Sequence, residues 1–326
     1  MATSRWNDPN RELWWAHTGG GGGQFGIITK YWFRTPGATG GPSLLLPKLP
    51  QTVRKAVVTW PWPQFNETNF TRTVMNHGAW HAANSDADSP YATMHSSLQI
   101  SSWFAGVIVL DVPMDAMRAD TQQLLDDYVR ALSAGVGVEP TVQSKDVPFL
   151  EATLTPTIGY GKYSRHKSMG GHLRKPFDAS QISTIYRALS DPEHWGIRLV
   201  YLAAYGGKIN TVSPQATAVA ARDSVMKFWF SCNWELPAQD EAEVNWVRKL
   251  HGDVWATSGG YPVPNDKWGG CYINYPDIDA ENPYVNTSGV PWSTLYHQSN
   301  YPRLQRVKAK CDPKNVLRHA LSVKPA

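Results

Sequence analysis

The stretch around which this chain is organised is Cys271-Tyr272-Ile273-Asn274-Tyr275-Pro276-Asp277-Ile278-Asp279. From Tyr272 onward the side chains alternate as in a short strand, which predicts Tyr272 and Asn274 on one face and Tyr275 on the other. Pro276 cannot continue a hydrogen-bonded ladder, so the strand should end at a bulge or at a sheet edge. Two phenols and an amide would then stand where a ligand can approach, although a phenol that satisfies a buried carbonyl is the commoner case.

Further motifs follow this stretch in a fixed order. They are Gly289-Val290-Pro291-Trp292, Asn300-Tyr301-Pro302-Arg303-Leu304 and Asp312-Pro313-Lys314-Asn315. Together with the Tyr-x-Asn-Tyr-x-Asp pattern that begins at Tyr272, this order resembles the C-terminal signature of the berberine bridge enzyme-like FAD-linked oxidoreductases. That family belongs to the vanillyl-alcohol oxidase, or PCMH-type, flavoprotein superfamily. A match in several parts over about fifty residues is more specific than a lone glycine motif.

The composition is that of a folded protein without a strong charge. The 326 residues are 42% hydrophobic and 18% charged, and the net charge is +4 with Lys and Arg scattered along the chain. No nucleic-acid-binding patch is predicted, and no apolar window is long enough to predict a membrane span. The 15 Trp and 14 Tyr suit ring-stacking sites for sugars or flat polycyclic ligands, and they suit a Trp-rich core equally well.

Metal binding and targeting leave weak signals. The three cysteines lack the spacing of metal ligands, and His77 and His81 have no apparent third ligand, so we predict no metal site and expect both histidines on a helix surface. The glycosylation sequons are Asn66-Glu67-Thr68, Asn69-Phe70-Thr71 and Asn286-Thr287-Ser288. They are compatible with a secreted glycoprotein, but they leave the localisation unknown.

Five consecutive glycines, Gly19 to Gly23, precede residues 24–33, which read as a buried, β-rich strand. Such glycines reach positive φ and let another group pack against the backbone, so a cofactor contact and a flexible turn both fit. In the related family a similar segment closes the flavin-binding domain. The resemblance implies that Ile27 and Ile28 contact the adenine side of FAD.

Hydrophobic periodicity predicts the remaining elements. Strands are expected at 52–60, 91–100, 103–110, 198–205 and 225–230, and helices at 69–83, 114–132 and 238–255. Thr71 and Thr73 are possible caps of the first of these helices, and Met117 belongs to the apolar stripe of the second. Paired strands with helices between them predict an α+β fold, in which helices cover one face of an antiparallel sheet.

The Pro- and Gly-rich segment from Pro36 to Pro50 marks a domain boundary. By resemblance, residues 1–36 are the C-terminal end of a PCMH-type FAD-binding domain, residues 37–265 form the substrate-binding domain, and residues 266–326 return to the FAD domain. The resemblance covers only the later part of a family member, without the segment that attaches the flavin. A fragment or a shortened gene model is therefore expected.

The resemblance also implies roles for single residues. Tyr275, the second Tyr of the motif, would be the base that takes a proton from the substrate while a hydride passes to FAD. Tyr272 and Asn274 would line the flavin ring. Asn300 would contact the cofactor, or would instead cap the last long helix.

Substrate contacts are expected from the strand that leads into Gly206-Gly207. Alternation places Tyr201, Ala203 and Tyr205 on one face, and the small Ala203 would leave room for a ligand. Alkaloid-cyclising relatives carry a Glu where this chain has Thr211. Amine cyclisation is therefore not expected.

Two functions remain open from the sequence. The first is an FAD-dependent oxidase that removes a hydride from an alcohol, a sugar or a hydroxylated secondary metabolite, with molecular oxygen as acceptor and a small molecule as substrate. The alternative is a non-catalytic remnant that binds a ligand or another chain without flavin.

Overall fold

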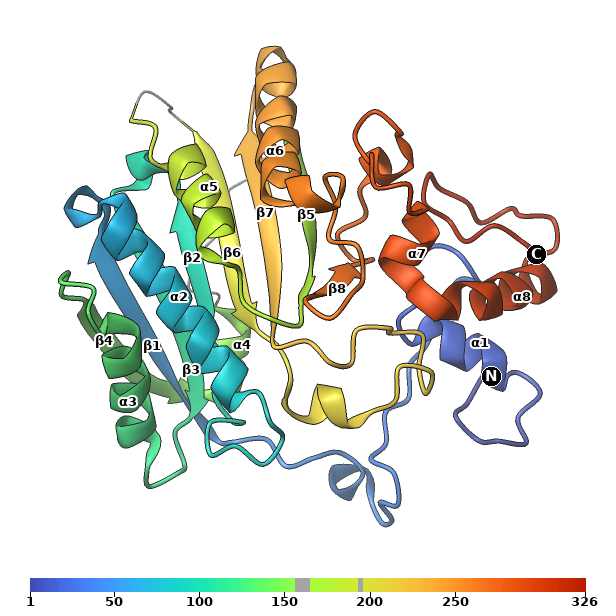
Figure 1. Cartoon of the computed structure of the whole chain (residues 1–326). Coiled ribbons are helices and arrows are strands. Elements are labelled where there is room, and N and C mark those ends of the chain that lie inside the picture. Colours follow the sequence, from blue (N-terminus) through green and yellow to red (C-terminus); the bar gives the residue numbers. More distant parts are fainter. Residues whose placement is uncertain (156–164, 193–195) are drawn as a thin grey trace.

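A computed structural model describes residues 1–155, 165–192 and 196–326. Its centre is an eight-stranded antiparallel sheet with the order β4-β1-β3-β2-β6-β7-β5-β8 (Figure 1). The strands are β1 (Thr52–Pro61), β2 (Ser97–Ser101), β3 (Val107–Asp115), β4 (Thr141–Pro148), β5 (Arg165–Leu173), β6 (Ile197–Ala204), β7 (Met226–Trp234) and β8 (Trp268–Cys271). The α-helices are α1 (Arg11–His17), α2 (Glu67–Asn84), α3 (Thr121–Ser133), α4 (Phe149–Leu154), α5 (Ala179–Leu189), α6 (Asp240–Val254), α7 (Trp292–His297) and α8 (Tyr301–Cys311).

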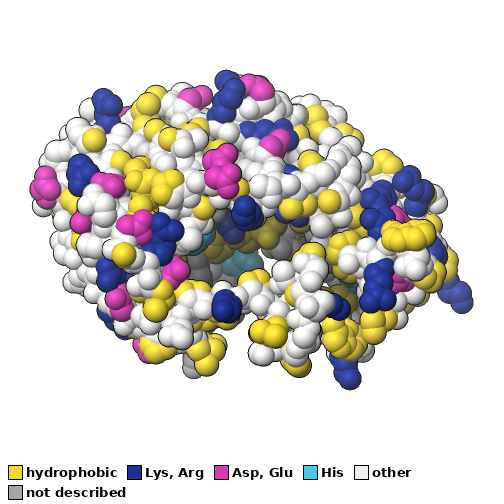
Figure 2. All heavy atoms as spheres, turned by 90° about the horizontal axis from the view of Figure 1, so that it is seen from below, with side chains coloured by type: hydrophobic (Ala, Val, Ile, Leu, Met, Phe, Trp, Pro, Cys, Tyr) yellow, Lys and Arg dark blue, Asp and Glu magenta, His cyan; other side chains and the backbone are white. Residues whose placement is uncertain are grey.

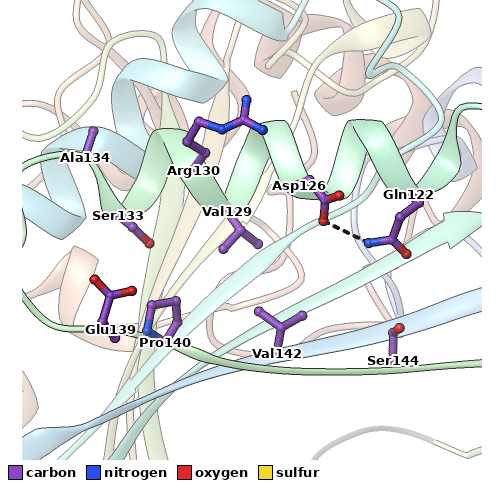
Figure 3. Close-up of a pocket in the computed structure, with 10 residues that line it drawn as sticks. All are labelled: Gln122, Asp126, Val129, Arg130, Ser133, Ala134, Glu139, Pro140, Val142 and Ser144. Carbon is purple, nitrogen blue, oxygen red and sulfur yellow. Dashed lines mark hydrogen bonds between the residues drawn. The ribbon is translucent and has the colours of Figure 1, made fainter.

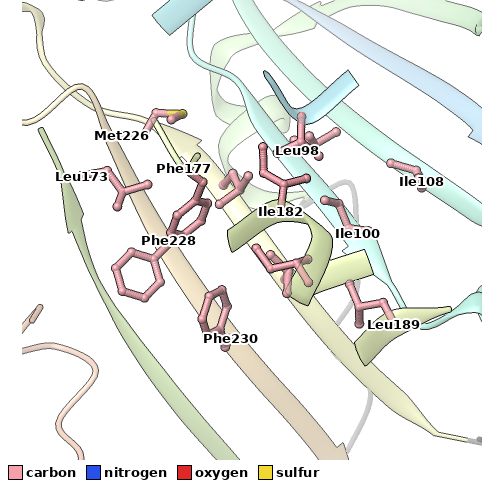
Figure 4. Close-up of a cluster of buried hydrophobic side chains, with 14 of the residues drawn as sticks. Leu98, Ile100, Ile108, Leu173, Phe177, Ile182, Leu189, Met226, Phe228 and Phe230 are labelled. Carbon is pink, nitrogen blue, oxygen red and sulfur yellow. The ribbon is translucent and has the colours of Figure 1, made fainter. Parts of the chain in front are cut away.

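Helices α2, α3, α5 and α6 cover one face of the sheet (Figure 1). The strand residues that point toward them are apolar, and Leu202 and Phe228 are among those with almost no exposed surface. Figure 4 shows this layer, in which Phe228 and Phe230 of β7 lie beside Phe177 and the α5 residue Ile182. Burying one such side chain contributes about 1.5–3 kcal/mol. The predicted α+β fold, with helices on one face of an antiparallel sheet, is confirmed.

The opposite face of the central strands is polar and aromatic. Side chains alternate along a strand, so Tyr201 in β6 and Lys227 and Trp229 in β7 point away from the helices. These three side chains are only partly buried. We call this surface of β2, β3, β5, β6 and β7 the open face.

The first and last helices pack side by side (Figure 1). The Arg303 guanidinium in α8 lies 4.0 Å from the ring centroid of Trp15 in α1 and pairs with Glu12 at 2.6 Å. Lys308, which is fully buried, donates hydrogen bonds of 2.7 Å to the Gln24 carbonyl oxygen and to a carboxylate oxygen of Asp312. The two ends of the described chain therefore form one small packed unit, while β8 joins the main sheet beside β5. The predicted boundaries at residues 36 and 265 stay predictions.

The expected strand at residues 24–33 is wrong. This segment has no regular secondary structure, and Ile27 and Trp32 are 86% and 68% exposed. A β-rich sequence forms a strand only where another strand supplies hydrogen bonds. No strand in the described ranges pairs with this segment.

Helix α2 begins earlier than expected because its cap differs from the predicted one. The Asn69 N–H donates to the Asn66 side chain at 3.0 Å, and the Asn66 N–H donates to the Asn69 side chain at 2.7 Å. This reciprocal pair satisfies two N–H groups that the first turn would otherwise leave unpaired. Thr71 and Thr73 lie inside the helix, so their predicted capping role is wrong.

Helix α3 begins at Thr121, later than predicted, because β3 continues to Asp115. Met117 precedes the helix and is 60% exposed, so its assignment to the apolar stripe is wrong. The rest of the predicted stripe, including Leu125 and Tyr128, is buried. Within the described ranges, no helix is both long and apolar enough to cross a bilayer.

His77 and His81 are not on a helix surface, as was predicted, but in the core between α2 and α3. They are 0% and 6% exposed. The Tyr128 hydroxyl lies 2.9 Å from His77 Nδ1, and His81 Nε2 lies 2.8 Å from Ser96 Oγ. In the part of the chain that the structure describes, no group of three metal-ligating side chains comes together.

Candidate active site

Two rows of side chains cross the open face, and the strand register fixes both. The first row is Asp111, Ser97, Ala203, Lys227 and His172. The second row is Val109, Gln99, Tyr201, Trp229 and Gly170. Neighbouring strands lie about 4.8 Å apart, and alternate residues of one strand about 7 Å apart, so the rows form one continuous surface.

The chain turns over this surface directly after β8. The Tyr275 N–H donates to the Tyr272 carbonyl oxygen at 2.8 Å, which closes a turn. The predicted short strand that begins at Tyr272, with Tyr275 on the opposite face from Tyr272, is therefore wrong. Pro276 prevents further pairing, and a few alternating residues fit a turn as well as a strand. The turn instead brings the rings of Tyr272 and Tyr275 edge to face, with centroids 5.1 Å apart.

Tyr275 lies flat on Trp229 of the second row. The ring centroids are 5.4 Å apart and the planes differ by 15°. Gly170 makes this contact possible, since an added Cβ there would lie 2.7 Å from Tyr275 Cδ2 and 2.7 Å from the Phe228 carbonyl oxygen. Trp229 also meets Tyr201 edge to face at 6.1 Å. The predicted base and one predicted substrate contact thus flank the same indole.

Tyr272 lies over the first row. The Asn274 amide donates to the Tyr272 hydroxyl oxygen at 2.8 Å, so these two residues meet as predicted, though through a turn. His172 packs against the edge of the Tyr272 ring at 5.1 Å, and Lys227 Nζ lies 5.7 Å from the same ring centroid. Because Asn274 occupies a lone pair of the phenol oxygen, the Tyr272 hydroxyl hydrogen can be donated to a ligand.

Burial shifts the pKa values of the groups around Tyr272. It raises the pKa of Tyr201, and that of Tyr205 to about 12. It also lowers the pKa of Lys227. Burial and the nearby Lys227 charge lower the pKa of His172 to about 3, so this imidazole is neutral at physiological pH.

A buried ionic network anchors the turn from below. Lys167 of β5 pairs with Asp277 and, at 2.8 Å, with Asp279, which Arg248 of α6 also contacts at 2.7 Å. The Tyr261 hydroxyl donates to Asp277 at 3.2 Å. Burial raises the pKa of Asp277 despite the cation beside it. Burial opposes ionisation of Asp279 as well, but hydrogen bonds from Arg248 and Lys167 outweigh it and lower the pKa of Asp279 to about 2.

The other predicted substrate contacts lie at the same end of β6. Ala203 is fully buried in the first row between Ser97 and Lys227. Tyr205 follows β6, packs against His172 at 4.9 Å, and donates its hydroxyl to the Ala221 carbonyl oxygen at 2.9 Å. The structure therefore gathers these residues around the turn, and their roles stay predictions.

The predicted adenine contacts are separate from this cluster. Ile27 and Ile28 follow the glycine run and are 86% and 40% exposed. The first part of the glycine run is closely packed, since an added Cβ at Gly21 would lie 2.9 Å from the Ile273 side chain and one at Gly19 would lie 2.6 Å from the Val219 backbone nitrogen, whereas one at Gly22 would meet no atom within 4 Å. Ile273 belongs to the turn, so the glycine run abuts the candidate site.

Asn300 is buried, and its amide donates to the Pro214 carbonyl oxygen at 2.9 Å. It precedes α8, but its side chain makes no capping hydrogen bond, so the predicted cap is wrong. Its contact with a cofactor stays a prediction.

Several residues of this site were missed at the sequence level. Two of them, Lys227 and Trp229, belong to β7, which was predicted as a strand. The other three belong to β5, which was not predicted, and they are Lys167, Gly170 and His172. One signal was available, because Lys227 and Trp229 are polar or amphipathic positions that alternate with the apolar Phe228 in a strand. The others depend on register between strands, which sequence spacing does not encode.

A hollow lies next to the turn. A hollow of about 320 Å³ is bordered by Lys167 and Ser168 of β5, by Pro276 and Asp277 after the turn, and by His319. Figure 2 shows that the molecule seen from below is hollowed, with hydrophobic, basic and histidine side chains inside the hollow.

A second hollow lies elsewhere. About 700 Å³ of space separates α3 from β4 and the residues before it, and Figure 3 shows Gln122 and Asp126 on the helix side with Val142 and Ser144 on the strand side. Gln122 donates to Asp126 at 2.8 Å. Because β4 and β8 are opposite edges of the sheet, this hollow is not part of the turn site.

Comparisons with known proteins match this arrangement. The family model described as berberine and berberine-like matches residues 271–324, which begin at the end of β8 and contain the turn. Aclacinomycin-N/aclacinomycin-A oxidase of Streptomyces galilaeus is 54% identical over all of this chain. The chain belongs to the berberine bridge enzyme-like family. This chain spans 60% of the length of the aclacinomycin oxidase.

Solved structures of this family share the fold. A crystal structure of aclacinomycin oxidoreductase has a TM-score of 0.96 and 53% identity over 100% of this chain and 66% of its own. The glycopeptide hexose oxidase DBV29, solved with teicoplanin, has a TM-score of 0.93 and 42% identity over 99% of this chain and 66% of its own. The berberine bridge enzyme-like assignment thus extends from the turn to the whole described sheet.

Proposed function

We propose that the protein is an FAD-dependent oxidase that removes a hydride from the hydroxyl-bearing carbon of a sugar or another hydroxylated secondary metabolite, with molecular oxygen as the final acceptor. One observation carries the proposal: Tyr275 is stacked on Trp229 over an aromatic open face, in a chain 54% identical along its length to an aclacinomycin oxidase. Relatives described as oxidases of aclacinomycin and of glycopeptide hexoses support the substrate class.

The rings of the turn fit a flat, partly polar cofactor. Tyr272 and Tyr275 are partly buried and expose aromatic surface next to each other, and Asn274 beside them is exposed. Flat heteroaromatic rings pack well against such edges and faces. We therefore assign Tyr272 and Asn274 to the flavin-ring side of the site.

The segment after the glycines fits the other end of the cofactor. Ile27, Ile28 and Trp32 expose apolar surface, and an exposed apolar patch in a folded protein usually packs against a ligand or another part of the protein. We assign Ile27 and Ile28 to the adenine side. Asn300 would reach FAD only if its amide exchanged its present bond with the Pro214 carbonyl.

Tyr275 would act as the general base. When bound, FAD would take up the hydride that leaves the substrate carbon. Tyr275 would take the hydroxyl proton, so that the carbon–oxygen single bond becomes a carbonyl and both electrons of the C–H bond leave with the hydride. A free phenol has a pKa of about 10, so its ionised form must be stabilised within the complex.

Tyr201, Ala203 and Tyr205 would position the substrate. The aromatic rings of Tyr201 and Trp229 suit a sugar ring or a flat polycycle. The small side chain of Ala203, which pairs with Lys227, leaves space for the substrate at the centre of the open face. The Tyr272 hydroxyl, fixed by Asn274, would donate to a substrate oxygen.

Anaerobic flavin reduction tests the proposal in protein expressed from the complete gene, with any coding sequence that precedes Met1. With a panel of sugars and alcohols, Tyr275→Phe should retain FAD but slow its reduction by about 10²–10⁴-fold, the usual contribution of general acid–base catalysis. Tyr284→Phe is the matched control, because Tyr284 is 92% exposed. An unchanged reduction rate in Tyr275→Phe would remove Tyr275 from the reaction.

The same preparation separates the oxidase from the non-catalytic alternative. An oxidase should bind FAD and show its visible absorbance. A colourless protein that takes up no added FAD would instead favour a module that binds a ligand or another chain.

A further inference from the structure

Lys227 is a cation of the open face that the proposed reaction does not use. It lies in the first row between Ala203 of β6 and His172 of β5, and its side chain is half-buried. Its Nζ lies 5.7 Å from the centroid of the Tyr272 ring. Withdrawing an ammonium group from water is costly unless another group compensates its charge.

The described residues supply no such group around Lys227. Among the residues that the structure describes, no ion pair or hydrogen bond engages its ammonium. The carboxylate of its row is Asp111, which is three strands away, about 14 Å at 4.8 Å per strand. Burial accordingly lowers the pKa of Lys227.

A second polar group beside Lys227 is also unsatisfied. His172 is 3% exposed, and neither of its ring nitrogens has a hydrogen-bond partner within the described ranges. Its ring is held between Tyr205 and Tyr272. Buried polar atoms nearly always find a partner in a folded protein, so one end of the open face has unused capacity for a polar ligand.

We propose that Lys227 binds a carboxylate group of the substrate, with His172 as a hydrogen-bonding neighbour. This inference rests on the proposed oxidase function, in which Tyr275 on Trp229 marks the reacting carbon. Lys227 and Trp229 are alternate residues of β7, so their side chains project from the same face of the sheet, and a substrate could contact Lys227 while its reacting carbon lies beside Tyr275. The substrate class is therefore a hydroxylated acid.

Benzoate and benzamide test this site, because they share a flat shape and differ in charge. Their dissociation constants are measured by titration calorimetry on the FAD-loaded protein, without turnover. Benzoate should bind at least about tenfold more tightly than benzamide, since a charge-assisted hydrogen bond is much stronger than a neutral one. Lys227→Met should abolish this preference and leave benzamide binding unchanged, and Lys227→Arg should retain most of it.

Lys208→Met is the matched control, because Lys208 is exposed and lies outside both rows. It should keep the wild-type preference for benzoate. The proposal is overturned if wild type does not prefer benzoate, or if Lys227→Met keeps the preference. If substrates reduce the flavin but the preference for benzoate does not depend on Lys227, only the carboxylate site is rejected. If the preference for benzoate depends on Lys227 but no substrate is oxidised, only the oxidase function is rejected.

Discussion

Replacing Lys167 with Met tests whether the ionic network holds the turn that presents Tyr275. The Lys167 side chain is 14% exposed, and those of its partners Asp277 and Asp279 are 2% and 4% exposed. After the substitution, Asp279 keeps its ion pair with Arg248 at 2.7 Å. Among the described residues, the donors that Asp277 keeps are uncharged, such as the Tyr261 hydroxyl at 3.2 Å. The substitution therefore leaves the buried Asp277 carboxylate without the cation that pairs with it directly.

The expected loss of unfolding free energy is about 3–5 kcal/mol at neutral pH, the usual cost of removing one partner of a buried ion pair. Exposed pairs are worth about 0–1 kcal/mol. Lys175→Met is therefore the control, because the Lys175 and Asp266 side chains, 2.8 Å apart, are 58% and 74% exposed. Both variants remove one lysine charge, so the difference between their losses of unfolding free energy measures the effect of burying the ion pair.

The penalty should also depend on pH in a defined direction. Burial raises the pKa of Asp277 above its ordinary 3.8, and loss of Lys167 raises it further. A carboxyl with a raised folded-state pKa binds a proton more readily when folded, so its cost is fully present at neutral pH and is relieved as pH falls through that pKa. The gap between Lys167→Met and wild type should thus shrink toward pH 4.

Urea unfolding followed by Trp fluorescence measures this gap at both pH values. Adding Asp277→Asn to Lys167→Met should recover part of the loss at neutral pH, because it removes the unpaired charge. A gap below about 1 kcal/mol at neutral pH, or one of equal size at both pH values, would refute the reasoning.

Two further predictions concern glycine and histidine. Gly170→Ala should lower the free energy of unfolding by about 1–3 kcal/mol and push Tyr275 off Trp229, which a changed Trp emission spectrum would report. Gly252→Ala in α6 is the control, because no atom lies within 4 Å of the added methyl, and it should raise the free energy of unfolding by up to about 1 kcal/mol. Equal effects of the two substitutions would contradict the packing argument. Burial lowers the pKa of His81 to about 4 from 6.5, so the unfolded chain takes up a proton that the native state excludes, and stability should fall as pH drops from 6.5 toward 4. His81→Asn should lose stability less steeply over that range in pH-dependent unfolding.

Periodicity predicted the architecture because long apolar alternations allow few interpretations. The strand predicted at 198–205 and the helix predicted at 238–255 match β6 and α6 within about two residues, since each buries a continuous apolar face. The β-rich residues 24–33 failed for the opposite reason. Strand formation needs a partner, and partner availability is not a property of the segment itself.

The candidate site was only partly predictable. The resemblance identified Tyr275, but the indole beneath it and the glycine that admits it come from β7 and β5, far apart in the sequence. The placement of Lys227 beside His172 likewise follows from the pairing of these two strands. Antiparallel register depends on which faces bury together, so spacing along one chain cannot give it.

The spacing of the Tyr-x-Asn-Tyr-x-Asp motif has a geometric cause. In a turn closed by the Tyr275 N–H and the Tyr272 carbonyl, both phenols meet over adjacent rows of one sheet, and Asn274 reaches back to the Tyr272 hydroxyl. Asp277, which follows Pro276, pairs with Lys167 beneath the sheet surface that Tyr275 contacts. Insertion of one residue between Tyr275 and Asp277 would lift the ring from Trp229 or pull the carboxylate from its cation. The motif therefore joins a reactive face to a buried anchor, and neither half can shift without the other.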